Sequence, residues 1–232
     1  MKKNILFLSF AIVFISASTA VVSSEFFSEE STQANKKIWG LDLSHHQGTI
    51  DWDLLAKQKP NFIFFKATEG VSKADARYSS YRKDARRLHI LTGAYHYFSY
   101  SSPGYWQAQN FLKTAKLQPG DLPPVLDIEW TKVMPDPTLI ANEAVAWLKV
   151  VENKLGVRPI IYCNYRFYTD YLKGKLKYEY PLWLSNYSRL PEYKCIFWQK
   201  TNNYSIEGVR GKVDYNLFMG GDKDDLQNLL LK

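Results

Sequence analysis

The sequence predicts an α/β fold, a single domain whose parallel sheet closes into a distorted, TIM-like barrel. From residue 38 onward, short apolar or β-branched runs alternate with longer amphipathic ones, and five such strand–helix pairs in a row are typical of a parallel sheet. A chain of 232 residues is long enough to close that sheet. Towards the C-terminal end the helices thin out and the strands lie closer together, so we expect an incomplete barrel.

Eight strands are expected, with helices between the early ones. The strands are expected at residues 38–44, 62–67, 91–98, 125–129, 159–163, 181–185, 196–199 and 212–217. The clearest helix follows the fourth strand, because apolar residues from Ile140 to Leu155 recur there at helical spacing. Pro137 suits its first turn and Gly156 suits its end. In such barrels the chemistry lies at the carboxyl ends of the strands, and reactive side chains are expected there.

The composition excludes several classes of protein. With 46% hydrophobic and 23% charged residues the chain is neither disordered nor fibrous, and two cysteines are too few for a disulfide scaffold. The formal net charge of +7 suits an anionic polymer such as cell-wall material. Because the Lys and Arg residues are scattered, and the dense run from Arg82 to Arg87 is expected on a solvated helix face, nucleic acid is not an expected partner.

The first 37 residues carry the pattern of an exported chain. Lys2 and Lys3 precede an apolar run and then small residues, so residues 1–20 are predicted to be a removable signal peptide and residues 21–37 a flexible leader. An uncleaved membrane anchor is the alternative, since the apolar run is only just long enough to span a bilayer. Residues 38–232 are expected to form the folded domain, secreted or periplasmic, without stable membrane insertion.

Acidic side chains stand at or near the ends of the predicted strands. Asp42 is near the end of the first strand and Asp214 lies on the eighth. Asp127 and Glu129 end the fourth strand and face the same way, because residues two apart on a strand share a face, with Cα atoms roughly 6–7 Å apart. Two desolvated carboxylates at this spacing raise one proton affinity, as protonation of a glycosidic oxygen requires. We interpret the pair as catalytic, the alternative being a pair of surface acids.

Other site chemistries find no supporting pattern. His45 and His46 are adjacent and would point to opposite faces of an extended strand, and no His-x-x-x-His or Cys-x-x-Cys spacing occurs, so no metal site is expected. The chain contains no phosphate-binding glycine loop and no Gly-x-Ser-x-Gly elbow, so neither a nucleotide nor another cofactor is expected. Cys163 and Cys195 are expected either to form a disulfide or to be two free buried thiols.

A series of short motifs follows in order along the chain. They are Gly-Leu-Asp-Leu-Ser-His-His-Gln-Gly at 40–48, Ile-Asp-Trp at 50–52, Lys-Ala-Thr-Glu-Gly at 66–70, Gly-Ala-Tyr-His-Tyr-Phe at 93–98, Pro-Val-Leu-Asp-Ile-Glu at 124–129, Pro-Leu-Trp-Leu at 181–184, Trp-Gln at 198–199 and Gly-Val-Arg-Gly-Lys-Val-Asp-Tyr-Asn at 208–216. With them the sequence resembles the glycoside hydrolase family 25 lysozymes, the Chalaropsis-type N-acetylmuramidases, over nearly all of residues 38–221. One departure is His89, which stands where the family often has a glycine that ends a helix.

The resemblance implies a (β/α)5(β)3 barrel that hydrolyses the β-1,4 bond between N-acetylmuramic acid and N-acetylglucosamine in peptidoglycan, acting as a monomer. By motif, the family's acid/base glutamate falls on Glu129 and its paired aspartate on Asp127, with further active-site aspartates on Asp42 and Asp214. The resemblance also implies retention of configuration, with the substrate's 2-acetamido group as nucleophile and Asp127 orienting it. A direct role of Asp127 or Asp214 is the alternative.

Further residues beside the acid-bearing motifs are expected to bind the glycan, since flat rings stack on the apolar face of a sugar. They are Tyr162, Tyr95, His96, Glu69, Trp183 and Trp198. For Glu69 the alternative is an ion pair with Lys66 that only fixes a loop. Two other functions are weighed: a non-catalytic peptidoglycan-binding barrel, against which the four acids argue, and a chitinase-like glycosidase, which would carry another Asp where Val125 stands.

Overall fold

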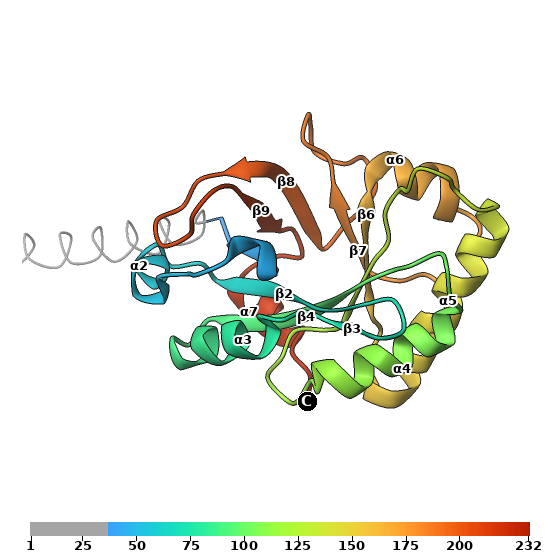
Figure 1. Cartoon of the computed structure of the whole chain (residues 1–232). Coiled ribbons are helices and arrows are strands. Elements are labelled where there is room, and N and C mark those ends of the chain that lie inside the picture. The colour runs from blue at the N-terminus through green and yellow to red at the C-terminus, as the bar shows by residue number, and fades with distance from the viewer. Residues whose placement is uncertain (1–36) are drawn as a thin grey trace, which may run out of the picture. The chain divides into compact units, whose positions relative to one another are not determined.

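Eight strands close into a barrel in the part of the chain that the structure, a computed structural model, describes: residues 37–232 (Figure 1). The barrel strands are β1 (Trp39–Leu43), β2 (Phe62–Glu69), β4 (Leu91–Tyr97), β5 (Val125–Asp127), β6 (Ile160–Asn164), β7 (Leu182–Ser185), β8 (Phe197–Tyr204) and β9 (Val213–Phe218). Each lies within a few residues of a predicted strand. The predicted signal peptide and nearly all of the predicted leader lie outside the described residues.

The barrel departs from the wholly parallel TIM type because it contains both parallel and antiparallel strand pairs. The neighbours run parallel from β1 through β2, β4, β5, β6 and β7 to β8. The last strand, β9, closes the ring and is antiparallel to both of its neighbours, β8 and β1. A short strand, β3 (Lys73–Ala74), pairs with the end of β2 outside the ring and was not predicted, because two residues carry no periodicity.

Helices follow the first five barrel strands and are missing between the last three. They are α2 (Trp52–Lys57), α3 (Tyr78–Arg87), α4 (Gly104–Ala115), α5 (Pro137–Leu155), and α6 (Tyr165–Phe167) with the π-helical turn η2 (Tyr168–Leu172); a 3-10 turn, η1 (His45–Gln47), follows β1, and α7 (Lys223–Asn228) follows β9. Figure 1 shows β8 and β9 joined as a long hairpin. The predicted (β/α)5(β)3 architecture is confirmed.

The longest helix, α5, begins and ends where its sequence dictates. The side chain of Asp136 accepts hydrogen bonds from the backbone N–H groups of Thr138 and Leu139, and Pro137 occupies the first helical position. Gly156 ends the helix in the left-handed region, at φ 69°. The apolar face of α5, including Trp147, is fully buried against the barrel.

Two apolar layers hold the fold together. The outer layer lies between strands and helices, and the inner layer fills the barrel with the rings of Phe62, Phe64 and Phe197. Gly93 is required by this inner layer, because a Cβ at that position would lie 2.3 Å from the ring of Phe64. These rings fill the barrel at the amino-terminal ends of the strands, so any site is restricted to the carboxyl-terminal ends.

Arginine residues of α3 correct one prediction. The run from Arg82 to Arg87 was expected on a solvated face, but Arg82 pairs with the fully buried Asp121, and Arg86 Nη2 lies 3.4 Å from Asp121 Oδ1. The two arginines are four residues apart on the same helix face, which turns towards the segment before β5.

Cys163 and Cys195 are both buried free thiols. No helix within the described residues is long and apolar enough to cross a membrane.

Candidate active site

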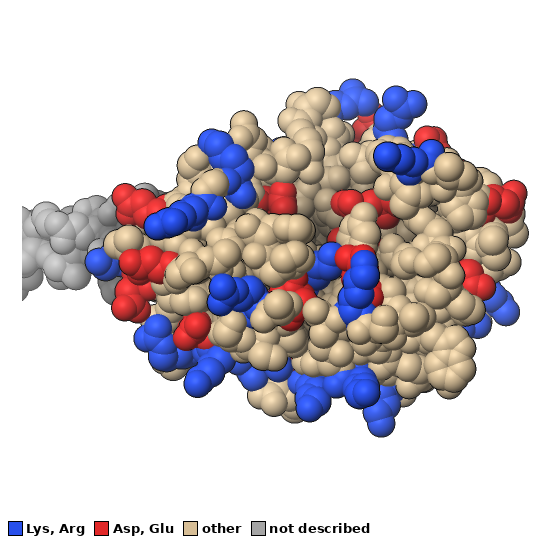
Figure 2. Space-filling view, in the orientation of Figure 1, with Lys and Arg blue, Asp and Glu red and all other residues tan. Residues whose placement is uncertain are grey.

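A cleft of about 530 Å³ opens at the carboxyl ends of the barrel strands. All four predicted catalytic acids line it: Asp42, Asp127, Glu129 and Asp214. Figure 2 shows acidic side chains facing the central hollow of this side of the molecule, while most Lys and Arg side chains lie towards the periphery. The test posed by the sequence, that reactive side chains gather at strand ends, is therefore met.

The positions of Asp127 and Glu129 are fixed by backbone hydrogen bonds to the neighbouring strands. Asp127 is the last residue of β5, and its carbonyl accepts from the N–H of Phe98 at 2.8 Å. The N–H of Ile128 donates to the carbonyl of Tyr162 at 3.0 Å, and the carbonyl of Glu129 accepts from the hydroxyl of Tyr100 at 2.6 Å. Both carboxyl groups are thus directed into the cleft.

Burial and the negative charges of neighbouring acids raise the pKa of both Asp127 and Glu129. Desolvation, followed by the charge of Glu129, raises the pKa of Asp127 well above its usual range. The Oδ1 atom of Asp127 is buried and has no hydrogen-bond partner. Desolvation, followed by the charge of Asp42, also raises the pKa of Glu129. Glu129 is the more exposed of the two carboxyl groups, so a bound ligand reaches it more easily.

Asp42 and Asp214 form a second acidic pair, across β1 and β9, where they are register partners. Asp42 Oδ2 accepts from Gln199 Nε2 at 3.1 Å and from Asn216 Nδ2 at 2.8 Å. Desolvation raises the pKa of Asp42, but these amide hydrogen bonds stabilise its charged form. Desolvation and the charge of Asp42 raise the pKa of Asp214 to about 9.

One wall of the cleft is a network of aromatic and amide side chains. The hydroxyl of Tyr162 donates to Gln199 Oε1 at 2.9 Å and lies within hydrogen-bonding reach of the Glu129 carboxyl. Trp183 Nε1 donates to Asn216 Oδ1 at 2.9 Å, which places the indole at the floor of the cleft. Tyr95, also a predicted binding residue, lines the same cleft.

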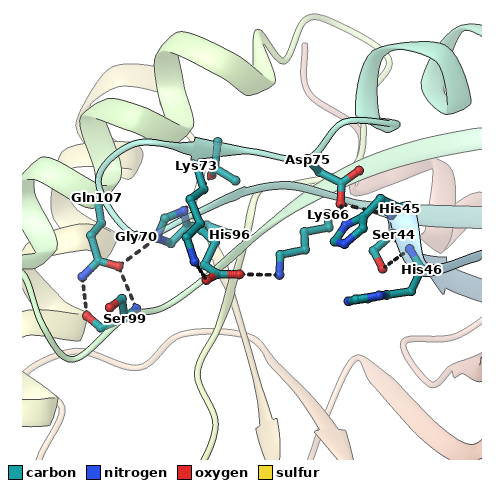
Figure 3. Close-up of polar contacts among 12 residues, drawn as sticks. Ser44, His45, His46, Lys66, Gly70, Lys73, Asp75, His96, Ser99 and Gln107 are labelled. Atoms are coloured by element: carbon teal, nitrogen blue, oxygen red, sulfur yellow. Dashed lines mark hydrogen bonds and ion pairs between the residues drawn. The ribbon is translucent and has the colours of Figure 1, made fainter.

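Two predicted binding residues, His96 and Trp198, do not line the cleft. The side chain of His96 is fully buried on the outer face of β4. Its ring nitrogens lie 2.7 Å from Thr68 Oγ1 and 3.1 Å from Gln107 Oε1, and Figure 3 shows the contact with Gln107. The indole of Trp198 donates to the carbonyl of Asn186 and packs in the outer layer. Side chains alternate along a strand, so the residues flanking each of them face the interior and these two face outward.

Glu69 lines the cleft and is also held in an ion-pair network, which includes the predicted pair with Lys66. Its carboxylate accepts from Lys66 Nζ at 2.8 Å and from Lys73 Nζ at 2.7 Å. These hydrogen bonds lower the pKa of Glu69 to about 2. Lys66 lies on the cleft side of this network, with Nζ 4.6 Å from the centre of the Tyr97 ring.

Sequence reasoning gave no role to Gln199, Asn216 and Tyr187, although the first two lie in quoted motifs. The hydroxyl of Tyr187 donates to Gln199 Oε1 at 2.8 Å, so Gln199 joins two tyrosines to Asp42. Asn216 could have been found, since it lies two residues after Asp214 and therefore shares its strand face. Among residues 37–232, no group of three His, Cys, Asp or Glu side chains is arranged to hold a metal ion.

Paired carboxyl groups with raised pKa values, in an aromatic-lined cleft at the top of a β/α barrel, define a glycosidase type of site. Comparison with known families agrees. Residues 41–209 match the model of the glycosyl hydrolases family 25, and the chain belongs to this family. It is therefore a glycoside hydrolase.

Relatives support this assignment along most of the chain. Uncharacterized protein YegX of Escherichia coli (strain K12) is 38% identical over 196 residues, covering 81% of this chain and 71% of that protein. Lysozyme M1 of Streptomyces globisporus is 29% identical over 208 residues, which cover 79% of this chain and 68% of that protein. A family 25 glycosyl hydrolase from Bacillus anthracis has a similar solved structure, with a TM-score of 0.77 and 32% identity, covering 83% of this chain and 93% of that chain.

Proposed function

We propose that the protein is a lysozyme that hydrolyses the β-1,4 bond between N-acetylmuramic acid and N-acetylglucosamine in peptidoglycan. The observation that carries the proposal is the convergence of Asp127 and Glu129, both with raised pKa, on one cleft. Family membership and the resemblance to Lysozyme M1 support the choice of substrate. An exported enzyme, guided by residues 1–20 and acting as a monomer through residues 38–232, fits this substrate.

In the first step, Glu129 donates its proton to the glycosidic oxygen as the bond to C1 of the muramic acid residue breaks. Burial keeps the carboxyl protonated at a pH where an ordinary glutamate has lost its proton. Tyr162, whose hydroxyl lies within reach of the Glu129 carboxyl, would hold that side chain in place.

Retention of configuration follows if the substrate's own 2-acetamido oxygen attacks C1 as the leaving group departs. Asp127 would orient the acetamido group, whose N–H would donate to the buried and otherwise unpartnered Oδ1 atom. The ionised Glu129 then removes a proton from water, whose oxygen adds to C1 and restores the acetamido group. Asp42 and Asp214 would hold the opposite wall of the cleft.

The Glu129→Gln variant tests the assignment of the acid. The amide keeps the size of the side chain but has no acidic proton, so clearing of purified peptidoglycan should fall at least about 100-fold, a loss of about 3 kcal/mol of transition-state stabilisation. Asp53→Asn, on the exposed face of α2, serves as the control and should clear peptidoglycan at the wild-type rate. Clearing by Glu129→Gln at the wild-type rate contradicts the assignment.

A further inference from the structure

A second, smaller pocket opens beside the catalytic cleft. Its volume is about 180 Å³, the share of liquid volume taken by roughly six water molecules. The polar residues that line it are His45, Lys66, Glu69, Lys73 and Asp75, and we call it the side pocket. Lys66 and Glu69 line both the side pocket and the cleft, so the two spaces adjoin. In Figure 3, Lys66 lies between the His45–Asp75 pair and Lys73.

The hydrogen-bond acceptors of the side pocket are already engaged. Each oxygen of the Glu69 carboxylate accepts from a different lysine. Asp75 has a fully buried side chain, and its Oδ2 contacts both the backbone N of His45 at 3.0 Å and the ring Nδ1 at 2.6 Å. The other oxygen of Asp75 accepts from the N–H of Arg77 at 2.9 Å. Every carboxylate oxygen of the side pocket thus already accepts from at least one donor of the protein.

The donors, in contrast, are in excess. An ammonium group has three N–H donors, and Lys73 uses one of them on Glu69 while its side chain is 73% exposed. Lys66 also donates to Glu69, and the face of the Tyr97 ring stabilises its charge. A pocket with spare donors and occupied acceptors suits a ligand group that only accepts hydrogen bonds, and a carboxylate is such a group.

We propose that the side pocket receives a carboxylate carried on the muramic acid residue, with Lys73 as the residue that distinguishes this sugar from plain N-acetylglucosamine. The proposal rests on the proposed function. Muramic acid differs from glucosamine by a lactyl ether on its ring, which carries either a free carboxylate or a peptide stem with its own carboxylates. The acids that line the cleft offer such a group no positive charge, whereas Lys66 and Lys73 do, so the side that carries these lysines is where it can bind.

Three glycan substrates test the proposal. The first is intact peptidoglycan, the second is glycan strands freed of peptide by an amidase, which leaves the lactyl carboxylates bare, and the third is those strands with the carboxylates converted to neutral methylamides. The kcat/KM of the wild-type enzyme, measured from new reducing ends, should be about 3- to 10-fold lower on the methylamide strands than on the bare strands, the range expected for a partly exposed charge pair.

Lys73→Met and Lys73→Glu are the informative variants, because an exposed side chain can be changed without loss of the fold. On carboxylate-bearing substrates Lys73→Met should lose about 3- to 10-fold in kcat/KM and Lys73→Glu more, since it adds a repelling charge. The difference from wild type should disappear on the methylamide strands. Lys113→Met, an exposed lysine on α4 away from both pockets, is the matched control.

The outcomes separate the two claims. Dependence on Lys73 with bare strands identifies the lactyl carboxylate as the ligand, and dependence only with intact peptidoglycan identifies the peptide stem; both support the side pocket. Equal kcat/KM of wild type and both Lys73 variants on all three substrates overturns it and leaves the lysozyme function standing. Absence of cleavage of every substrate by the wild-type enzyme overturns the proposed function itself.

Discussion

The two ends of the barrel treat buried carboxylates in opposite ways. At the amino-terminal end of β5, the fully buried Asp121 accepts hydrogen bonds from Arg82, from Thr92 Oγ1 at 3.0 Å and from the N–H of Gln118 at 2.9 Å. At the carboxyl-terminal end, Asp127 is also buried, but its Oδ1 atom has no hydrogen-bond partner. A satisfied acid stabilises the fold, whereas an unsatisfied one keeps its proton and is available for chemistry. The same residue type is therefore satisfied and structural at one end, and at the other it is left unsatisfied in the cleft where we propose catalysis.

Removing the satisfied acid should have the largest effect on stability. In Asp121→Ala the charges of Arg82 and Arg86 lose their partner, and we expect the free energy of unfolding to fall by about 3 kcal/mol. Urea unfolding followed by circular dichroism measures this loss. The exposed pair of Asp53 and Arg87, 3.6 Å apart, provides the control, since Asp53→Ala should cost less than about 1 kcal/mol. Equal losses in the two variants would remove the contrast between a buried and a surface pair.

Removing the unsatisfied acid should do the reverse. The folded pKa of Asp127 is raised, so its contribution to stability is present below the ordinary pKa of an aspartate and is lost as the pH rises through the folded value. Asp127→Asn should therefore raise the free energy of unfolding by about 1–2 kcal/mol at pH 7, an advantage that fades towards pH 4, while activity falls. Asp42→Asn should gain less, because two amides already stabilise the Asp42 carboxylate. Loss of stability in Asp127→Asn at pH 7 would contradict this account.

The smallest expected effect concerns the end of α3, close to the satisfied acid. His89 has φ 57°, in the left-handed region where glycine is favoured, which explains why the family often has glycine at this position. We expect His89→Gly to raise the free energy of unfolding by about 0.5–1 kcal/mol, measured by thermal unfolding. His89→Ala keeps the strain and should give no gain. A similar gain from both variants would mean that the imidazole, not the backbone, is the source.

The sequence identified the catalytic end of the barrel but not every residue that faces it. The four acids could be predicted because charged side chains are conspicuous at the ends of otherwise apolar strands. Whether Tyr95 or His96 faces the cleft could not be predicted, because β4 is buried on both faces and its sequence carries no alternation between apolar and polar residues. Trp198 on β8 could not be assigned a face either, because two apolar residues precede the inward-facing Gln199 and the sequence shows no alternation there.

The satisfied acid escaped prediction for a different reason. Asp121 lies in a loop, and the two arginines that pair with it come from α3, some 35 to 40 positions earlier in the chain. Such a pairing depends on how α3 packs beside β5, which no local pattern encodes. The spacing of the basic run on α3 therefore predicted a solvated face, whereas Arg82 and Arg86 of that run pair with the buried Asp121.

The identity of the sugar at the newly formed reducing end tests the central claim most directly. Purified peptidoglycan is digested with the wild-type protein, the products are reduced with borohydride, and their ends are identified by mass spectrometry. We predict muramitol ends, because in the proposed mechanism Glu129 protonates the oxygen that leaves C1 of the muramic acid residue. Glucosaminitol ends would assign cleavage to the other glycosidic bond and contradict the account.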